Sequence, residues 1–276
     1  MKLFATDLDG TLLGPEDGIH PRDAAAIAEA RARGVIVTIA TGRLTSRTHP
    51  IARALGLDAP LVCADGGVLA CAISERVLAR RALPIATVER ALDLLAHRDL
   101  SSFVFTHDAI HSCARGAAHH AFVRGWSHTV TAHEALRDAP AWRTDEAAIM
   151  VLGVGEPAGI EQVLAGLADI QGELELTSFD IADARVVRLM ARGATKGQAL
   201  LDLAAQLGVA REDIAVAGDW YNDISMFEVA GSAYAMPQAP AELNSLASHV
   251  LSDDAPRRGA IADALEHWLA RPLGRG

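Results

Sequence analysis

Two aspartates stand two positions apart near the start of the chain, in the stretch ATDLDGTLLG, residues 5 to 14. Asp7 and Asp9 follow the apolar opening MKLFA and precede a Gly-Thr pair. Like charges this close repel each other unless something between them needs both. The pair therefore points to a bound cation or to acid–base chemistry between carboxyl groups.

Other polar groups follow runs of residues typical of buried strands. Thr41 comes directly after VIVTIA, and Asp219 comes after IAVAG, with Asp223 one helical turn farther on. In a parallel α/β sheet, ligands bind beyond the carboxyl ends of the strands, so we expect these groups to meet Asp7 and Asp9 there. Several carboxylates converging in this way form the oxygen-rich site that Mg²⁺ prefers.

The predicted cation allows the first two aspartates to have different roles. With its charge held by the metal, Asp7 can act as a nucleophile toward phosphorus, because the cation shields an incoming phosphate from the carboxylate. Asp9 can donate a proton to the leaving alkoxide and later take a proton from water. The predicted chemistry is the transfer of a phosphoryl group.

A phosphate also needs hydrogen-bond donors. Thr41 and the backbone amide of Gly42 lie between a predicted strand and a predicted helix, as anion sites often do, and Lys196 begins the helical stretch TKGQALL. Simpler interpretations stay open for each: a helix N-cap for Thr41, a solvated helix residue for Lys196, and helix capping for Asn222 and Asp223.

The elements that would position these groups occur at both ends of the chain. Strands are predicted at 1–8, 35–42 and 61–67, with helices at 21–34 and 47–60 between them. The same alternation returns after Thr195, with helices at 195–208, 222–231, 240–247 and 259–270 and strands at 213–219 and 232–237. This alternation predicts an α/β fold with a Rossmann-like parallel sheet buried on both faces.

The middle of the chain has a different pattern. It contains predicted helices at 85–98 and 159–169 and strands at 101–107, 147–154, 173–180 and 185–191. We interpret it as a large α+β domain inserted into the α/β one. The predicted catalytic core is discontinuous, residues 1–83 and 188–276, and the inserted cap is residues 84–187.

Four ordered motifs carry a family resemblance: DLDGTLL, ATGR, TKGQAL and GDWYNDISMF. They resemble the motifs of the haloacid dehalogenase superfamily, and the ending YAMPQAPAELNSLASHVLSDDAPRRGAIADAL is similar to that of its Cof-type hydrolases. The resemblance implies a substrate-selecting cap over the core and a set of roles. These are Asp7 as nucleophile and metal ligand, Asp9 as acid/base and as ligand through its backbone carbonyl, Thr41 and Lys196 on phosphate, Asp219 on magnesium, and Asn222 with Asp223 supporting the metal or its waters.

Two places depart from the family pattern. The chain has ADGG, with Asp65, where members usually have Asn-Gly, and Pro237 and Gln238 where Gly-Asn is common. Asp65 lies on the predicted cap side of the site. The substrate of any one relative therefore does not transfer to this chain.

Composition limits the classes of partner. The chain has 276 residues, half of them hydrophobic, and a net charge of −10, which disfavours nucleic acid and anionic lipid. No apolar run is long enough to span a bilayer, and the three cysteines form no C-x-x-C pair, so we expect a cytoplasmic protein without a disulfide framework. Oligomeric partners are not indicated by the sequence.

We therefore predict a magnesium-dependent phosphatase that hydrolyses a small phosphorylated metabolite (a sugar, polyol or cofactor-precursor phosphate) through an aspartyl-phosphate. A sugar phosphomutase and a weakly catalytic, sugar-phosphate-binding regulator are the alternatives, since one fold supports several functions. The intact set of Asp7, Asp9, Lys196 and Asp219 argues against the regulator.

Overall fold

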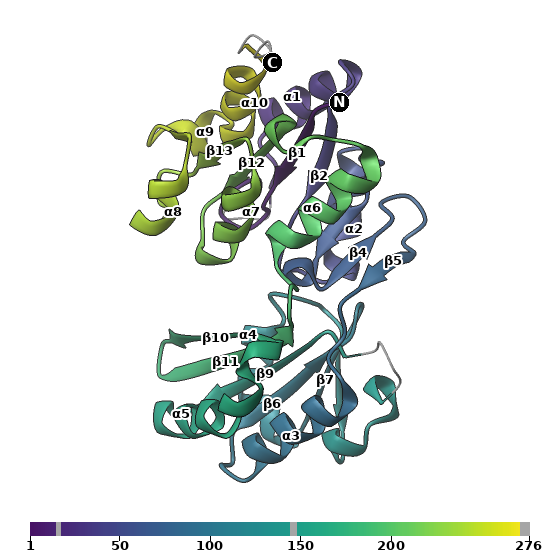
Figure 1. The fold of residues 1–276 in the computed structure, drawn as a ribbon, viewed down its shortest axis with the longest axis vertical. Coiled ribbons are helices and arrows are strands. Elements are labelled where there is room, and N and C mark those ends of the chain that lie inside the picture. The colour runs from purple at the N-terminus through teal and green to yellow at the C-terminus, as the bar shows by residue number, and fades with distance from the viewer. Residues whose placement is uncertain (15–17, 144–147, 271–276) are drawn as a thin grey trace.

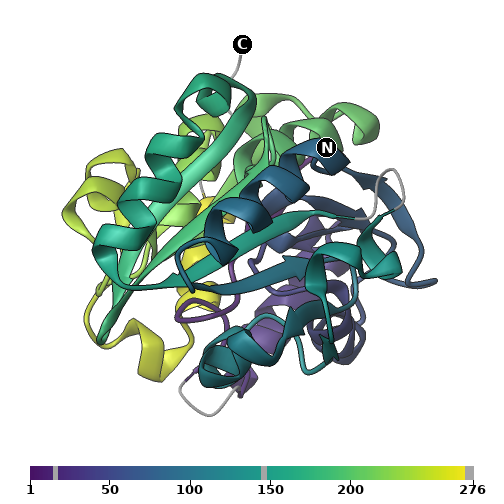
Figure 2. The ribbon, with the colours of Figure 1, turned by 90° about the horizontal axis from the view of Figure 1, so that it is seen from below.

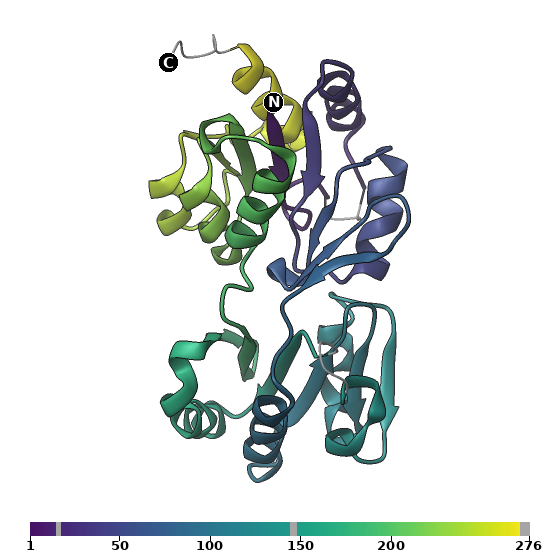
Figure 3. The same cartoon turned by 45° about the vertical axis from the view of Figure 1, so that its right-hand side comes forward.

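The fold has two regions stacked along its longest axis (Figure 1). It is seen in a computed structural model, which describes residues 1–14, 18–143 and 148–270. The chain crosses between the regions at two places, after Arg80 and after Ala191, and Figures 1 and 3 show both crossings. The upper region contains both ends of the described chain, and the lower one contains the middle of the sequence.

The upper region is built on a five-stranded, fully parallel sheet of strand order β14-β13-β12-β1-β2. Its strands are β1 (Leu3–Thr6), β2 (Ile36–Ile39), β12 (Ile214–Gly218), β13 (Ser232–Ala235) and β14 (His249–Val250). Its helices are α1 (Pro21–Ala32), α2 (Thr45–Ala54), α6 (Lys196–Leu207), α7 (Ile224–Val229), α8 (Ala241–Leu246), α9 (Ala255–Arg258) and α10 (Ala260–Ala270). The predicted α/β class with a parallel sheet is confirmed.

Residues of β1 alternate between the two faces of the sheet. Phe4 packs in a cluster with Ile27 of α1 and Leu265 of α10, whereas Leu3 packs with Leu200 of α6 and Met226 of α7. Alternation with period two places successive side chains on opposite faces. Because both faces are covered by helices, apolar residues are needed at most positions of the central strands, and the buried Thr6 and Thr38 hydroxyls donate to backbone carbonyls instead.

The predicted third strand departs from the parallel sheet. β3 (Leu61–Cys63) has one parallel bridge to it, between Val62 and Ala40, and otherwise forms a small antiparallel sheet with β4 (Val68–Ala70) and β5 (Val77–Arg80). The chain turns back directly after β3, and Gly66 in that turn has φ +94°, a conformation open to glycine. A Cβ there would lie 2.1 Å from the carbonyl oxygen of Thr195, so this turn packs against the start of α6.

The lower region has a six-stranded sheet of order β10-β11-β9-β6-β7-β8, antiparallel except for the pair β7 and β8. Its elements are α3 (Ile85–Ala96), β6 (Ser101–Phe105), β7 (Ile110–Cys113), α4 (His120–Val123), β8 (Val130–His133), β9 (Met150–Gly155), α5 (Pro157–Gly166), β10 (Leu174–Ile181) and β11 (Ala184–Ala191). α3 and α5 cover the face turned away from the upper region, as seen from below in Figure 2. The opposite face looks toward the parallel sheet.

Most middle elements were predicted, and two strands were not. β7 (IHSC) and β8 (VTAH) have only 4 residues each, and half or more of each strand is polar, so the pattern of their residues is too short to predict strands. The first residue of the predicted strand 147–154 lies outside the described residues. Among the described residues, no helix combines the length and the apolar composition needed to cross a bilayer.

The start of α6 is packed tightly against the start of α7. A Cβ on Gly197 would lie 2.0 Å from the backbone carbonyl oxygen of Ser225. We expect Gly197→Ala to lower the free energy of unfolding by about 1–3 kcal/mol, the usual cost of overpacking a fixed backbone contact. Chemical denaturation measures it. Gly172→Ala, where no atom lies within 4 Å of the added carbon, is the control; equal effects of the two changes would contradict the close contact.

Candidate active site

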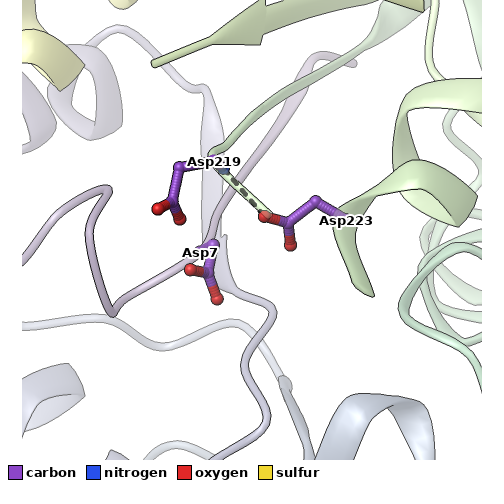
Figure 4. Close-up of side chains that lie close together, drawn as sticks. All are labelled: Asp7, Asp219 and Asp223. Carbon is purple, nitrogen blue, oxygen red and sulfur yellow. Dashed lines mark hydrogen bonds between the residues drawn. The ribbon is translucent and has the colours of Figure 1, made fainter. Parts of the chain in front are cut away.

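Two aspartates lie side by side at the carboxyl edge of the parallel sheet. Asp7 directly follows β1 and Asp219 directly follows β12, and these strands are hydrogen-bonded neighbours. The backbone N–H of Asp7 donates to the carbonyl of Ala217 at 2.9 Å, which continues the ladder to the site. One carboxylate oxygen each of Asp7, Asp219 and Asp223 lies within 4.8 Å of the others (Figure 4). Within the described chain, no other His, Cys, Asp and Glu side chains form such a group.

A buried lysine joins this cluster from α6. The Nζ of Lys196 donates to Oδ1 of Asp7 at 2.7 Å and to Oδ1 of Asp223 at 2.6 Å. Its side chain is fully buried, so the interpretation of Lys196 as a solvated helix residue is wrong. Thr195 caps the helix by accepting from the N–H of Gln198, which fixes Lys196 as the first helical residue, aimed at the sheet edge.

Burial and neighbouring charge oppose each other in this pair. Burial raises the pKa of Asp7, and the carboxylates of Asp223 and Asp219 raise it further, while Lys196 lowers it. Burial by itself would lower the pKa of Lys196, but Asp223 and Asp7 hold it above its ordinary value. The lysine therefore stays charged, and the site keeps more negative than positive groups.

Asp223 also caps the turn that follows Asp219. Its Oδ2 accepts the backbone N–H groups of Asp219 at 2.9 Å and Trp220 at 3.0 Å. Asp223 thereby caps the short 3-10 helix Tyr221–Asp223, but its side chain makes no capping bond at the start of α7, and its other oxygen accepts from Lys196. The side chain of Asn222, the residue before Asp223, donates to Oδ1 of Asp65 at 2.8 Å.

Asp219 is held by side chains from both ends of the chain. Thr11 Oγ1 donates to its Oδ1 at 3.0 Å, and Gln238 Nε2 donates to its Oδ2 at 3.3 Å and to the carbonyl of Gly10 at 2.7 Å. Burial and the charge of Asp223 raise the pKa of Asp219 to about 6. Gly10, at φ +83°, leaves the space for this carboxylate, since a Cβ there would be 2.3 Å from Oδ2.

Asp9 lines the same cavity as Asp7 and Asp219 but is far more exposed, with 59% of its side chain accessible to solvent. Both of its carboxylate oxygens accept hydrogen bonds from Arg43, one of them from Nε at 2.8 Å. The backbone N–H of Arg43 donates to Thr41 Oγ1 at 3.1 Å. The N-cap interpretation of Thr41 is wrong, because α2 starts at Thr45 and its capping residue is Leu44.

A cavity of about 520 Å³ opens over the cluster. Asp7, Asp9 and Asp219 line it together with Gly42, Arg43 and Asn222, and aromatic side chains form part of its wall. A larger cavity of about 710 Å³ touches Asp9 but neither Asp7 nor Asp219. The smaller cavity therefore combines the carboxylates with a cationic side chain, and an anionic group of modest size fits it.

The structure places the residues chosen from the sequence as follows. One buried cluster contains Asp7, Lys196, Asp219 and Asp223. The cavity over it is lined by Asp9, Gly42 and Asn222. Thr41 is buried, and its hydroxyl accepts the backbone N–H of Arg43. Sequence reasoning did not assign contacts to Asp65, Gln238 or Arg188. The first two stand where the chain departs from the family pattern, which is the signal that singled them out. No sequence signal marked Arg188, a strand residue of the middle region.

Comparison with known proteins agrees with the resemblance seen in the motifs. The chain matches the family described as haloacid dehalogenase-like hydrolase over residues 4–265. Pyridoxal phosphate phosphatase YbhA of Escherichia coli is 28% identical over 262 residues, 92% of this chain and 94% of the relative. 5-Amino-6-(5-phospho-D-ribitylamino)uracil phosphatase YwtE of Bacillus subtilis is 29% identical over 270 residues, 91% of this chain and 92% of the relative. A haloacid dehalogenase-like hydrolase from Bacteroides thetaiotaomicron has the same fold, with a TM-score of 0.80, 22% identity and coverage of 97% and 99%.

The ammonium of Lys196 between two buried carboxylates predicts a large stability effect. Lys196→Met leaves Asp7 and Asp223 buried without their common partner. We expect the free energy of unfolding, measured by denaturant titration with excess chelator, to fall by about 3–5 kcal/mol. Lys2→Met, at a partly exposed lysine directly before β1, is the control. A loss for Lys196→Met no larger than that of the control would contradict the role of the ammonium.

Proposed function

The chain belongs to the haloacid dehalogenase-like hydrolases and is a phosphatase of that family, and we propose that its substrate is a small phosphorylated metabolite. The observation that carries this proposal is the cavity in which Asp7 and Asp219 lie beside Gly42 and Arg43, with Trp126 of the inserted region in its wall. The relatives described above fit it, since they include a pyridoxal phosphate phosphatase and a 5-amino-6-(5-phospho-D-ribitylamino)uracil phosphatase. A protein substrate would not pass easily into a cavity closed by two regions of the chain.

We propose Mg²⁺ as the cofactor, because the residues present fit it. The carboxylates of Asp7, Asp219 and Asp223 outnumber their one buried cation, Lys196, and a hard divalent ion prefers oxygen ligands. Asp7, Asp219 and the backbone carbonyl of Asp9 would hold the ion, with Asp223 and Asn222 in support. When bound, it would add positive charge beside the phosphoryl oxygens and the attacking carboxylate.

The proposed reaction uses Asp7 as nucleophile. A carboxylate oxygen of Asp7 bonds to phosphorus as the ester P–O bond breaks, and the leaving alkoxide takes the proton of Asp9. Water then attacks the phosphorus of the aspartyl-phosphate, Asp9 takes a proton from that water, and the bond to Asp7 breaks. Inorganic phosphate leaves, and both aspartates return to their starting state.

Arg43 bears on the second role of Asp9. Both carboxylate oxygens of Asp9 are held by Arg43, so Asp9 reaches the oxygen of the leaving group only when this contact loosens. A phosphoryl dianion entering the cavity competes with Asp9 for the same guanidinium. We propose that substrate binding itself frees Asp9 to carry the proton, while Thr41, Gly42 and Lys196 help to hold the phosphoryl group.

The inserted region, predicted at 84–187 and extending in the structure to the end of β11 at Ala191, is proposed to select the leaving group. The core residues named above contact only the phosphoryl group and its counterion, and such contacts are nearly the same for every phosphomonoester. Residues of the inserted region, including Trp126, line the remaining wall of the cavity. Discrimination between metabolites therefore depends on this wall.

Removal of the metal should abolish turnover. We expect phosphate release to stop with excess chelator and to return when Mg²⁺ is added, because without a cation the carboxylates repel the substrate. Asp219→Asn should raise the Mg²⁺ concentration for half-maximal activity by at least about tenfold. Calorimetric titration with Mg²⁺ alone gives a second readout. Asp253→Asn, on the surface, is the control, and turnover that persists after complete chelation contradicts the proposal.

The covalent scheme makes a separate prediction. Asp7→Asn should lower kcat by at least about 1,000-fold, because a neutral amide is a poor nucleophile, whereas Asp9→Asn should slow both steps and keep the nucleophile. In a rapid acid quench of the unchanged enzyme, mass spectrometry should find a phosphoryl group on the peptide that contains Asp7. If single turnovers release phosphate with no phosphorylated peptide at any time, water attacks the substrate directly.

A further inference from the structure

A second cavity of about 540 Å³ adjoins the one over the carboxylates. The two share Trp126, Trp220 and Asn222 in their linings, so a molecule with its phosphoryl group near Asp7 extends naturally into the second space. This second space lies between the core and the inserted region, because Asp65 and Trp220 come from one and Arg188 from the other. The side chains that line this second cavity are therefore placed to contact the leaving group.

Aromatic side chains dominate the wall of the second cavity. Trp126 and Phe179 come from the inserted region, and Trp220 and Tyr221 come from the core. Trp220 is 57% exposed and Tyr221 is 50% exposed, which is high for such large apolar rings. The four rings therefore contribute apolar surface to one cavity, two of them from the inserted region and two from the core.

The rings are held by their local structure. The register of β10 and β11 pairs Thr177 with Arg188, and Leu176 packs toward α3 and α5, so Phe179 lies with Thr177 on the face toward the core. The carbonyl of Trp126 accepts the backbone N–H of Leu44 at 2.9 Å. Trp220 and Tyr221 contact each other edge to face, with centroids 5.3 Å apart.

The polar groups of this cavity are largely bound to one another. Both oxygens of Asp65 accept hydrogen bonds, from Asn222 at 2.8 Å and from Arg188. Arg188 Nε donates to Thr177 at 3.1 Å. A sugar with several hydroxyl groups would exchange its water for few new partners here, and unmatched polar groups are costly to bury. A flat ring with few polar substituents gives up fewer hydrogen bonds to water when it enters the cavity.

We propose that the leaving group is a planar aromatic or heteroaromatic ring that carries the phosphate on a short alkyl arm and stacks in this cavity on Trp126 and Trp220. Offset and edge-to-face contacts between rings are favourable beyond the area that they bury. The pair of Asp65 and Arg188 lies at the wall, where it meets polar ring substituents. This inference rests on the proposed phosphatase function and names its substrate class.

Three primary alkyl phosphates test the proposal: benzyl phosphate, cyclohexylmethyl phosphate and glucose 6-phosphate. All three have an alkoxide leaving group on a CH₂ arm, and the first two differ mainly in planarity and aromatic character. We expect kcat/KM for benzyl phosphate to exceed that for cyclohexylmethyl phosphate by roughly 5- to 20-fold, with glucose 6-phosphate below both. Glucose 6-phosphate cleaved as well as benzyl phosphate would overturn the proposal.

Variants locate the preference in the cavity. Trp220→Ala and Phe179→Ala should lower the ratio of kcat/KM for benzyl over cyclohexylmethyl phosphate, and Trp220→Phe should restore most of it. Leu246→Ala, an exposed apolar residue of α8 outside both cavities, is the matched control and should leave the ratio unchanged. A ratio unmoved by both aromatic variants overturns the assignment of the site. Failure of the unchanged enzyme to release phosphate from all three esters and from glycerol phosphate contradicts the phosphatase proposal itself, which separates the two failures.

Discussion

The interaction on which the site depends is the contact of one buried ammonium with two buried carboxylates. Lys196 bonds to Asp7 and Asp223, and Asp223 in turn accepts the backbone N–H of Asp219. A buried charge is tolerated only with a matched partner, so the ends of β1 and β12 and the start of α6 must meet within hydrogen-bond distance. The parallel order of β1 beside β12, and the glycine after Lys196 that lets α6 approach α7, follow from that requirement.

The core and the inserted region contribute different kinds of side chain to the cavities. The core holds an excess of carboxylate, which is useful only when a cation and a phosphoryl group share the space. The inserted region instead brings the rings of Trp126 and Phe179 to the second cavity, together with Arg188, which pairs with Asp65 of the core. Burial by itself would raise the pKa of Asp65, but Arg188, Lys196 and the hydrogen bond from Asn222 lower it. This carboxylate is therefore charged, and its contact with Arg188 joins the inserted region to the core close to Lys196 and Asn222.

Features of the fold and the site that depend on neighbouring residues can be predicted from the sequence, whereas contacts between residues far apart along the chain cannot. The parallel sheet and its helices follow from local apolar patterns, and the carboxylates follow from short motifs after strands. The pairing of Asp65 with Arg188 joins residues 123 positions apart and has no local signature. The contact of Asp9 with Arg43 likewise joins residues far apart in the sequence, and the polar residues of β7 and β8 hide the strand pattern.

The departures from the family pattern are explained by contacts rather than by loss of the site. Gln238 reaches from the segment after β13 to the carbonyl of Gly10 and to Asp219, so it ties the loop after β1 to the carboxylate that follows β12. Asp65 replaces a neutral residue of the common pattern and, being charged, requires a cation from the inserted region, which Arg188 supplies. One departure therefore fixes the carboxylate of Asp219, and the other joins the core to the strand that carries the aromatic wall. Both act on the surroundings of the buried carboxylates and leave the contacts of Lys196 with Asp7 and Asp223 in place.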